Sequence, residues 1–421
     1  MIARLKPKSE FSRNVLTLML GTTAAQAIPI AISPILTRMY GPDDFGIFAL
    51  YISIVAILSI AATGRYELAV MLPDSEDDAD ILVKLSIGIT LIFSFFLFLI
   101  IVLFNTPITL LLGNPEISFW LYIVPVSVFL TGTYNTLNYW LNRKKYYLMM
   151  SKNRVLQSTI LASSQVSFGW GNISGGLMLG TLLGHAFSSI ILVWRFATYP
   201  RKKTVIYFDS SESWKLAQAY KHHPMHLLPS HWVGTAAMQF PIFIISNAFG
   251  AAATGFYFMA QRLISLPTSI IANAIGDVYR QKASVEYREK SEFRALFLKT
   301  LFSTIKIAVI PFLILYFVAP SLFALIFGES WRVAGEYAQI IIISAFFQFV
   351  FTPVDKGALI VSATAYIFIW NVMRLLLFIL LFGVSVWFQL SIEKIIWLIA
   401  LINISLYAAD GLVEYKLSMR K

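Results

Sequence analysis

Long apolar segments recur along this sequence and are separated by short polar loops. Twelve of them are long enough, at 1.5 Å of rise per helical residue, to cross a hydrocarbon core of about 30 Å. They cover residues 13–37, 43–72, 80–104, 117–141, 150–169, 174–196, 225–248, 255–280, 296–319, 336–355, 365–388 and 392–411. Lipid cannot satisfy backbone polar groups, so spanning segments of this length must be helical. We therefore expect an all-α polytopic membrane protein with twelve transmembrane helices.

The composition excludes soluble classes. Of the residues, 58% are hydrophobic and 13% are charged, and no polar segment is long enough to form a soluble domain. The net charge of +11 could indicate nucleic acid, but the basic residues gather in alternate loops, so nucleic acid is not an expected partner. Cysteine is absent, which excludes disulfides. His222, His223 and His226 have no carboxylate among them, which favours a basic patch over a metal site.

The distribution of lysine and arginine predicts the orientation. These residues are concentrated in both terminal tails and in the loops at residues 143–154, 201–221 and 280–294. The opposite loops are nearly free of them, with Arg38, Arg332 and Lys394 as exceptions. By the positive-inside rule both termini are cytoplasmic and the number of helices is even.

One predicted helix, residues 255–280, carries a charge inside the membrane. Arg262 lies seven residues from its start, where an arginine costs about 2.5–3.5 kcal/mol on insertion scales. Further polar or small residues share its face at helical spacing: Ser265, Ser269, Asn273, Gly276, Asp277 and Arg280. Such a face meets water or protein, so we expect it to line a wet, positively charged cavity. The alternative is a dry polar seam against a neighbouring helix, which would need no arginine.

A weak internal repeat divides the chain. Residues 21–30 (GTTAAQAIPI) are similar to residues 234–242 (GTAAMQFPI), and each copy precedes a turn with two glycines five residues apart. This predicts two six-helix bundles, residues 1–205 and 206–421, related by a pseudo-two-fold axis along the membrane normal. Transporters built from such repeats place substrate at the repeat interface. Gln26 and Gln239, which the repeat pairs, are therefore candidate substrate ligands.

Three stretches carry a family resemblance: RYELAVMLP at 65–73, GFYFMAQRLISLP at 255–267 and IANAIGDVYRQKASVEY at 271–287. They resemble bacterial polysaccharide flippases of the O-antigen (Wzx) type. These belong to the multidrug/oligosaccharidyl-lipid/polysaccharide exporter (MOP) superfamily, together with the multidrug and toxin extrusion (MATE) transporters and the lipid II flippases. The resemblance covers nearly the whole chain.

The resemblance implies a MATE-like fold around a central cavity that opens alternately to the two sides of the bacterial inner membrane. The passenger would be an undecaprenyl-pyrophosphate-linked oligosaccharide, moved from the cytoplasmic to the periplasmic leaflet during O-antigen and lipopolysaccharide synthesis. Such a protein is a transporter and not an enzyme, with no catalytic residue and no metal site. A polysaccharide polymerase and a chain-length regulator would be its partners.

Arg262 matches an arginine of the lipid II flippases and is the first candidate phosphate ligand, because guanidinium binds phosphate bidentately. Those relatives also carry arginines within the first helix, whereas residues 14–37 contain none. The basic residues that could replace them are Arg65, Arg374 and Lys306. For the last two, snorkelling to the membrane surface is the alternative. With Asn273, Ser269, Gln26 and Gln239, these complete the predicted substrate-binding set.

Asp277 and Glu67 are the candidates for ion coupling or gating, through proton exchange or sodium binding. An ion pair with a nearby basic residue, such as Arg280, is the alternative. Arg65 and Glu67 are two apart on a helix, so we expect each to need a separate partner. No cofactor is expected, apart from coupling to an H⁺ or Na⁺ gradient.

Two other functions remain open. A MATE-like drug or metabolite antiporter for cationic substrates would need buried carboxylates in the first bundle, whereas the charge within the membrane is basic. A membrane polysaccharide polymerase or ligase would need a large outer loop or domain, and the predicted outer loops are short.

Overall fold

The computed structural model describes residues 10–200, 210–361 and 363–419, and within these ranges it contains helices and turns but no β-strand. The longer helices are α1 (Glu10–Ala31), α3 (Pro42–Ala62), α5 (Glu76–Leu112), α7 (Val124–Arg143), α8 (Tyr147–Trp170), α9 (Gly176–Ala197), α10 (Ser210–Ala219), α11 (Leu228–Lys290), α12 (Arg294–Phe327), α13 (Arg332–Phe351), α15 (Thr364–Phe388) and α16 (Ile392–Leu417). The shorter ones are α2 (Ser33–Met39), α4 (Tyr66–Ala69), α6 (Ile117–Leu121), η2 (His223–Leu227), η3 (Glu329–Trp331), η4 (Thr352–Val354) and α14 (Gly357–Ile360). The all-α expectation is confirmed for the described residues.

Within the described residues, nine helical segments are long and apolar enough to cross a membrane. One of them contains α11, whose 63 residues would extend about 95 Å as a straight helix, three times the hydrocarbon core. Gly250, with φ 78° and ψ −168°, interrupts its helical backbone and separates two helices. α7 and α8 coincide with predicted spans but are not among the nine. The count of twelve therefore stays a prediction.

Internal contacts divide the chain into two compact units. The first unit comprises Met1–Tyr40 and Leu50–Thr235, and the second comprises Gly41–Ala49 and Ala236–Lys421. The first turns of α3 therefore belong with the C-terminal half of the chain. The boundary predicted at residues 205 and 206 lies outside the described residues and stays a prediction.

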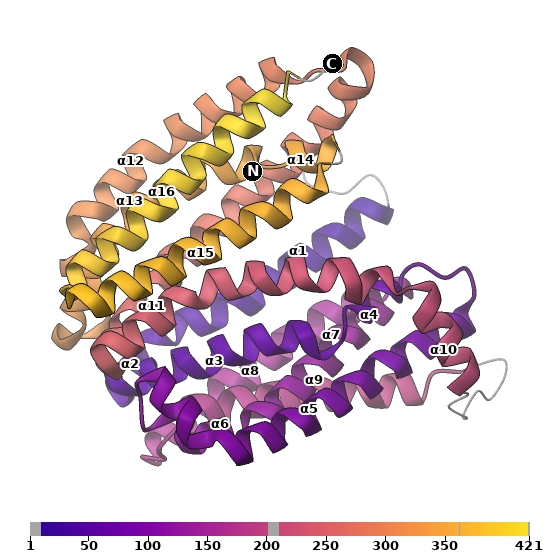
Figure 1. Cartoon of the computed structure of the whole chain (residues 1–421), viewed down its shortest axis with the longest axis horizontal. Helices are drawn as coiled ribbons and strands as arrows, with labels where there is room; N and C mark the ends of the chain where they lie inside the picture. The colour runs from indigo at the N-terminus through magenta and orange to yellow at the C-terminus, as the bar shows by residue number, and fades with distance from the viewer. Residues whose placement is uncertain (1–9, 201–209, 362, 420–421) are drawn as a thin grey trace. The chain divides into compact units, whose positions relative to one another are not determined.

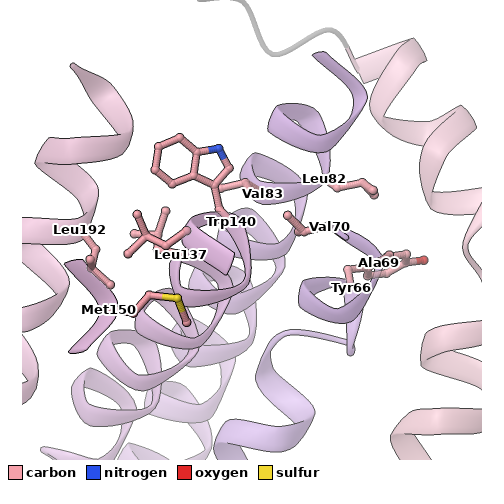
Figure 2. Packing of buried hydrophobic residues seen from close by; sticks show 10 residues of the cluster. Tyr66, Ala69, Val70, Leu82, Val83, Leu137, Trp140, Met150 and Leu192 are labelled. Carbon is pink, nitrogen blue, oxygen red and sulfur yellow. The ribbon is translucent and has the colours of Figure 1, made fainter. Parts of the chain in front are cut away.

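In the first unit, α8 packs along α1 and α9, and α7 contacts both α5 and α9 (Figure 1). Its core is centred on Trp140 of α7, which is fully buried. The side chains of Leu137, Met150, Leu192 and Val70 belong to the same cluster (Figure 2). The indole Nε1 of Trp140 donates a 3.0 Å hydrogen bond to Asp80 Oδ1, so this polar atom is satisfied inside the core.

In the second unit, α13 packs against both α12 and α16, and α15 packs against α16 (Figure 1). A second core cluster contains Tyr279, Ala283, Phe293, Phe297 and Val354. It therefore joins the C-terminal part of α11 to α12 and to the segment after α13.

The second unit also contains a reciprocal contact between the start of α3 and α11. A methyl group added to Gly46 would collide with the carbonyl oxygen of Ala251, and one added to Gly255 would collide with that of Pro42. The internal repeat places Gly46 and Gly255 at equivalent positions, and it also pairs residues 42 and 251. Two repeats that pack about a two-fold axis make this kind of exchanged contact.

Candidate functional site

Arg262 lies in the second half of α11 and is half-buried. Its guanidinium carbon lies 5.7 Å from the centroid of the Phe258 ring, a cation–π distance. No ion pair or hydrogen bond joins its side chain to another described residue. The Arg262 guanidinium therefore donates none of its N–H groups to another described residue. Its role as a phosphate ligand stays a prediction.

The first unit contains a cavity of about 570 Å³ between α1, α7 and α8. It is lined by Leu18, Thr22, Ala25, Gln26, Tyr134, Asn135, Asn138, Tyr139, Asn142, Met150, Arg154, Gln157 and Ser158. Among the predicted substrate ligands, Gln26 lines this cavity. The lining is rich in amides and hydroxyls, and among the described residues Arg154 is its one charged member.

Arg154 is a site residue that the sequence analysis missed. It lies in α8, and its Nη1 donates a 2.5 Å hydrogen bond to Thr22 Oγ1 of α1. Close packing of the same helices brings it there: a methyl group on Gly21 would collide with Ser151, whose hydroxyl donates to the Thr17 carbonyl at 2.8 Å. Arg154 therefore supplies a positive charge beside the part of α1 after Asn14, which contains no basic residue.

The second unit contains a cavity of about 400 Å³ formed by α11, α13, α15, α16 and the segment around η4. The predicted ligands Ser269, Asn273 and Arg374 line it. The other charged residues in its wall are Asp355, Lys356, Asp410 and Glu414. Ser269 and Asn273 of the α11 stripe thus line a polar cavity. Its described wall has three carboxylates and two basic residues, so it is not the positively charged cavity that was predicted, and Arg262 is not in its wall.

Arg374 does not snorkel to the surface. Its Nη2 donates a 2.7 Å hydrogen bond to Asn403 Oδ1, and its guanidinium carbon lies 5.7 Å from the centroid of the Tyr407 ring. Its Nε is buried and has no hydrogen-bond partner among the described residues. No carboxylate of the described residues forms an ion pair with it, although Asp355, Asp410 and Glu414 line the same cavity.

The carboxylates of this cavity are a second set that the sequence analysis missed. Glu414 is 2% exposed; its Oε1 accepts a 3.1 Å hydrogen bond from the Ala358 amide, and its buried Oε2 has no partner among the described residues. The Tyr366 hydroxyl donates to Asp410 Oδ1 at 2.5 Å. Asp355 forms an ion pair with Lys356 at 2.5 Å.

The remaining predicted residues lie apart from both cavities. Lys306 is exposed beside the exposed apolar side chains of Phe302, Val309 and Ile310, as the snorkelling alternative expects. Asp277 is exposed on α11, and no ion pair joins it to a described residue. Gln239 is half-buried and lines neither cavity.

The expectation that Arg65 and Glu67 need separate partners is wrong. They pair with each other, with Arg65 Nη1 and Glu67 Oε1 3.0 Å apart. The helix is interrupted between α3 and α4, where Gly64 and Arg65 both have positive φ, at 58° and 62°. The helical spacing that would separate the two side chains therefore does not apply.

We expect Glu67→Gln to destabilise the protein by about 3 kcal/mol, because it leaves the Arg65 guanidinium, which is 17% exposed, without its counter-charge. The double variant Arg65→Leu/Glu67→Leu should recover most of this loss, since it removes both charges. Thermal unfolding in detergent measures the stability of the single variant and of the double variant. Glu329→Gln is the control: its ion pair with Arg332 is exposed, so the unfolding temperature should change little. Equal losses of stability in Glu67→Gln and Glu329→Gln would contradict this interpretation of the Arg65–Glu67 ion pair.

Residues 35–336 match the family described as "Polysaccharide biosynthesis protein". The chain is also 24% identical over 375 residues to the succinoglycan biosynthesis transport protein ExoT of Rhizobium meliloti (strain 1021). That match covers 86% of this chain and 72% of the relative.

Two solved structures show a similar fold. The lipid II flippase MurJ, in an inward closed conformation, matches with a TM-score of 0.72 at 12% identity, over 96% of this chain and 90% of MurJ. A MATE-family multidrug resistance transporter of the MOP superfamily, in an inward-facing conformation, matches with a TM-score of 0.65 at 14% identity, over 93% and 94% of the two chains. The chain therefore belongs to the polysaccharide biosynthesis protein family and has the fold of the MOP superfamily, as the sequence resemblance predicted.

Proposed function

We propose that this protein is a flippase that moves an undecaprenyl-pyrophosphate-linked oligosaccharide across the bacterial inner membrane, from the cytoplasmic to the periplasmic leaflet. The family match and the transport protein of succinoglycan biosynthesis support a saccharide passenger. The structural similarity to a lipid II flippase supports the proposal that this saccharide is lipid-linked. Both termini would be cytoplasmic, as the distribution of lysine and arginine predicts.

One observation carries the proposal: spanning helices hold arginines that no carboxylate of the described residues neutralises. Arg262 is such a residue, and so is Arg154, because the described residues that line its cavity include no carboxylate. An uncompensated guanidinium is costly in a membrane, and a phosphate or another anionic group of a passenger would offset that cost. A cationic drug would instead be repelled.

The proposed mechanism is alternating access between two six-helix bundles. The reciprocal contact of Gly46 and Gly255 supports two repeats related by a two-fold axis, because equivalent residues exchange the same contact. The sugar and the pyrophosphate would pass through the hydrophilic interior while the polyprenyl tail stays in lipid.

We further propose that an H⁺ or Na⁺ gradient drives the cycle through the carboxylates of the second unit, in addition to the predicted candidates Asp277 and Glu67. Intramembrane carboxylates are typical of ion and proton pathways. Glu414 has a buried oxygen without a partner among the described residues, in the wall of a cavity that also contains Asp410 and Asp355. Glu67, by contrast, already forms an ion pair with Arg65.

Glu414→Gln should therefore lower gradient-driven export at least about tenfold, which corresponds to 1.4 kcal/mol. Glutamine keeps the shape and can still accept the hydrogen bond from Ala358, so the protein should remain in the membrane. Glu289→Gln, at an exposed site of α11 outside the cavity, is the matched control and should respond to the gradient as the wild type does. Export by each variant in vesicles with an imposed pH or sodium gradient measures the effect. A Glu414→Gln protein that responds to the gradient as the wild type does would exclude this site.

The function itself is tested in a strain that lacks the gene. The strain should accumulate lipid-linked repeat units in the cytoplasmic leaflet and should lose the surface polysaccharide, and the intact gene should restore both. A strain with normal surface polysaccharide and greater sensitivity to drugs would instead indicate a MATE-like antiporter.

A further inference from the structure

We propose that the cavity of the first unit is a saccharide-binding subsite, which takes hydroxyl-rich sugars that adjoin one anionic group. The inference rests on the proposed function, because it names the part of the passenger that this cavity holds. Four features carry it: a stripe of asparagines, two tyrosines, a single arginine and the size of the cavity.

The asparagine stripe is the first feature. Asn135, Asn138 and Asn142 lie at positions i, i+3 and i+7 of α7, so they share one face, and all three line the cavity. Gln26 adds an amide from α1. No hydrogen bond joins any of these four side chains to another described residue.

The chemistry of the amides indicates what they bind. Each offers two N–H donors and a carbonyl acceptor, which matches sugar hydroxyls that both donate and accept. Amides in a transmembrane helix are costly unless they meet water or a polar ligand. The stripe extends about 10 Å along the helix axis, which suits a chain of sugar rings better than a single small ion.

Tyr134 and Tyr139 flank the stripe on the same helix and line the same cavity. Their rings can pack against the apolar faces of sugars, and their hydroxyls can bond to sugar oxygens. Both side chains are half-buried, so they are accessible from the cavity.

Arg154 sets the charge preference. It is the one charged residue that the described part of the chain contributes to the wall, and its hydrogen bond to Thr22 uses one of its five N–H donors. The described wall of the cavity in the second unit holds three carboxylates against two basic residues, Arg374 and Lys356, and so favours an anionic passenger less. An anionic group is therefore better placed beside Arg154: the carboxylate of an acidic sugar or the phosphate that precedes the first sugar.

The volume fits a short saccharide. About 570 Å³ lies within the range of roughly 300–1,000 Å³ that is typical of small-molecule sites. The subsite would therefore recognise the first sugars of the passenger and leave the rest of the oligosaccharide outside.

The test is a binding measurement on the purified full-length protein in lipid nanodiscs, with two probes. One probe is the lipid-linked repeat unit extracted from the deletion strain, and the other is polyprenyl pyrophosphate without sugar. The wild type should bind the first at least about tenfold more tightly, because several sugar hydrogen bonds add to the contacts of the shared lipid. Asn135→Leu/Asn138→Leu should abolish this preference and leave the affinity for the sugar-free lipid unchanged, which also shows that the variant is folded. Asn138→Gln, which retains an amide, should keep part of the preference.

Arg154→Gln distinguishes the two sources of the anionic group. Weaker binding of the sugar-bearing probe alone indicates an acidic sugar, and equal weakening of both probes indicates the phosphate; either result supports the subsite. The control is Lys152→Gln on the exposed side of α8, which should bind both probes as the wild type does. Unchanged binding of both probes by Arg154→Gln would refute the assigned role of the arginine.

The result that overturns the subsite is a double asparagine variant that keeps the wild-type preference for the sugar-bearing probe. A wild type that binds neither probe would instead contradict the proposed function. The two failures are therefore distinguishable in one experiment.

Discussion

Arg262→Ala is expected to reduce polysaccharide export at least about thirtyfold while the protein remains in the membrane. Removing one partner of a buried, charge-assisted contact costs about 2–5 kcal/mol, and 2 kcal/mol corresponds to that factor. No described residue forms an ion pair or a hydrogen bond with the Arg262 side chain, so the loss would mainly reflect the passenger, beyond the cation–π contact with Phe258 that the variant also removes. Arg262→Lys should restore part of the activity, since it keeps the charge and loses the bidentate geometry.

Surface polysaccharide in the complemented deletion strain, normalised to the amount of protein in the membrane, measures the effect. Arg288→Ala is the matched control, because Arg288 is an arginine in the same helix whose Nε donates to the Ser284 carbonyl in the exposed C-terminal part. Normal polysaccharide in the Arg262→Ala strain would refute the assigned role of this arginine.

Gly46→Leu and Gly255→Leu are expected to prevent normal folding or export, since each side chain would be driven into the backbone of the other segment. Overpacking of a tight interior costs about 1–3 kcal/mol, and a collision with rigid backbone should lie at or above the upper end. The smaller variants Gly46→Ala and Gly255→Ala should each lower the thermal stability in detergent. Their combined effect should be less than the sum, because both disturb one contact.

The control for these variants is Gly88→Ala in α5, where an added methyl group has no atom within 4 Å and the helix should gain slightly from alanine. Fluorescence-detected size-exclusion chromatography and thermal unfolding measure folding, and the complemented strain measures export. Gly46→Leu and Gly255→Leu proteins as stable and active as Gly88→Ala would show that the reciprocal contact is dispensable.

The sequence predicted those features that depend on local pattern. Apolar segments of spanning length indicated an all-α membrane protein, and the helical spacing of Ser269 and Asn273 predicted a shared polar face, which lines a cavity. The two glycine pairs predicted a repeat; Gly46 and Gly255 make the reciprocal contacts expected of one, while the two-fold relation itself stays a prediction. In each case the period of the helix or the missing side chain of glycine carries the information.

The features that the sequence analysis missed depend on tertiary contact or on a local exception. Arg154 lies at the end of a basic loop, so the positive-inside rule explained its charge without a role in a site. Only the packing of α8 against α1 shows that it lines a cavity. Glu414 meets the Ala358 amide across 56 positions of sequence, which no local period reveals. Arg65 and Glu67 pair because two consecutive residues with positive φ break the helix, and a non-glycine residue at positive φ is rarely foreseen from sequence.

Translocation by the purified protein tests the central claim most directly. Proteoliposomes would carry lipid-linked repeat units in one leaflet, and a membrane-impermeant glycosidase on the opposite side would report the units that cross. We predict that the wild type makes them accessible many times faster than protein-free vesicles do, and that Arg262→Ala vesicles stay close to the protein-free rate. A wild type no faster than protein-free vesicles, or an Arg262→Ala protein as fast as the wild type, would contradict the account.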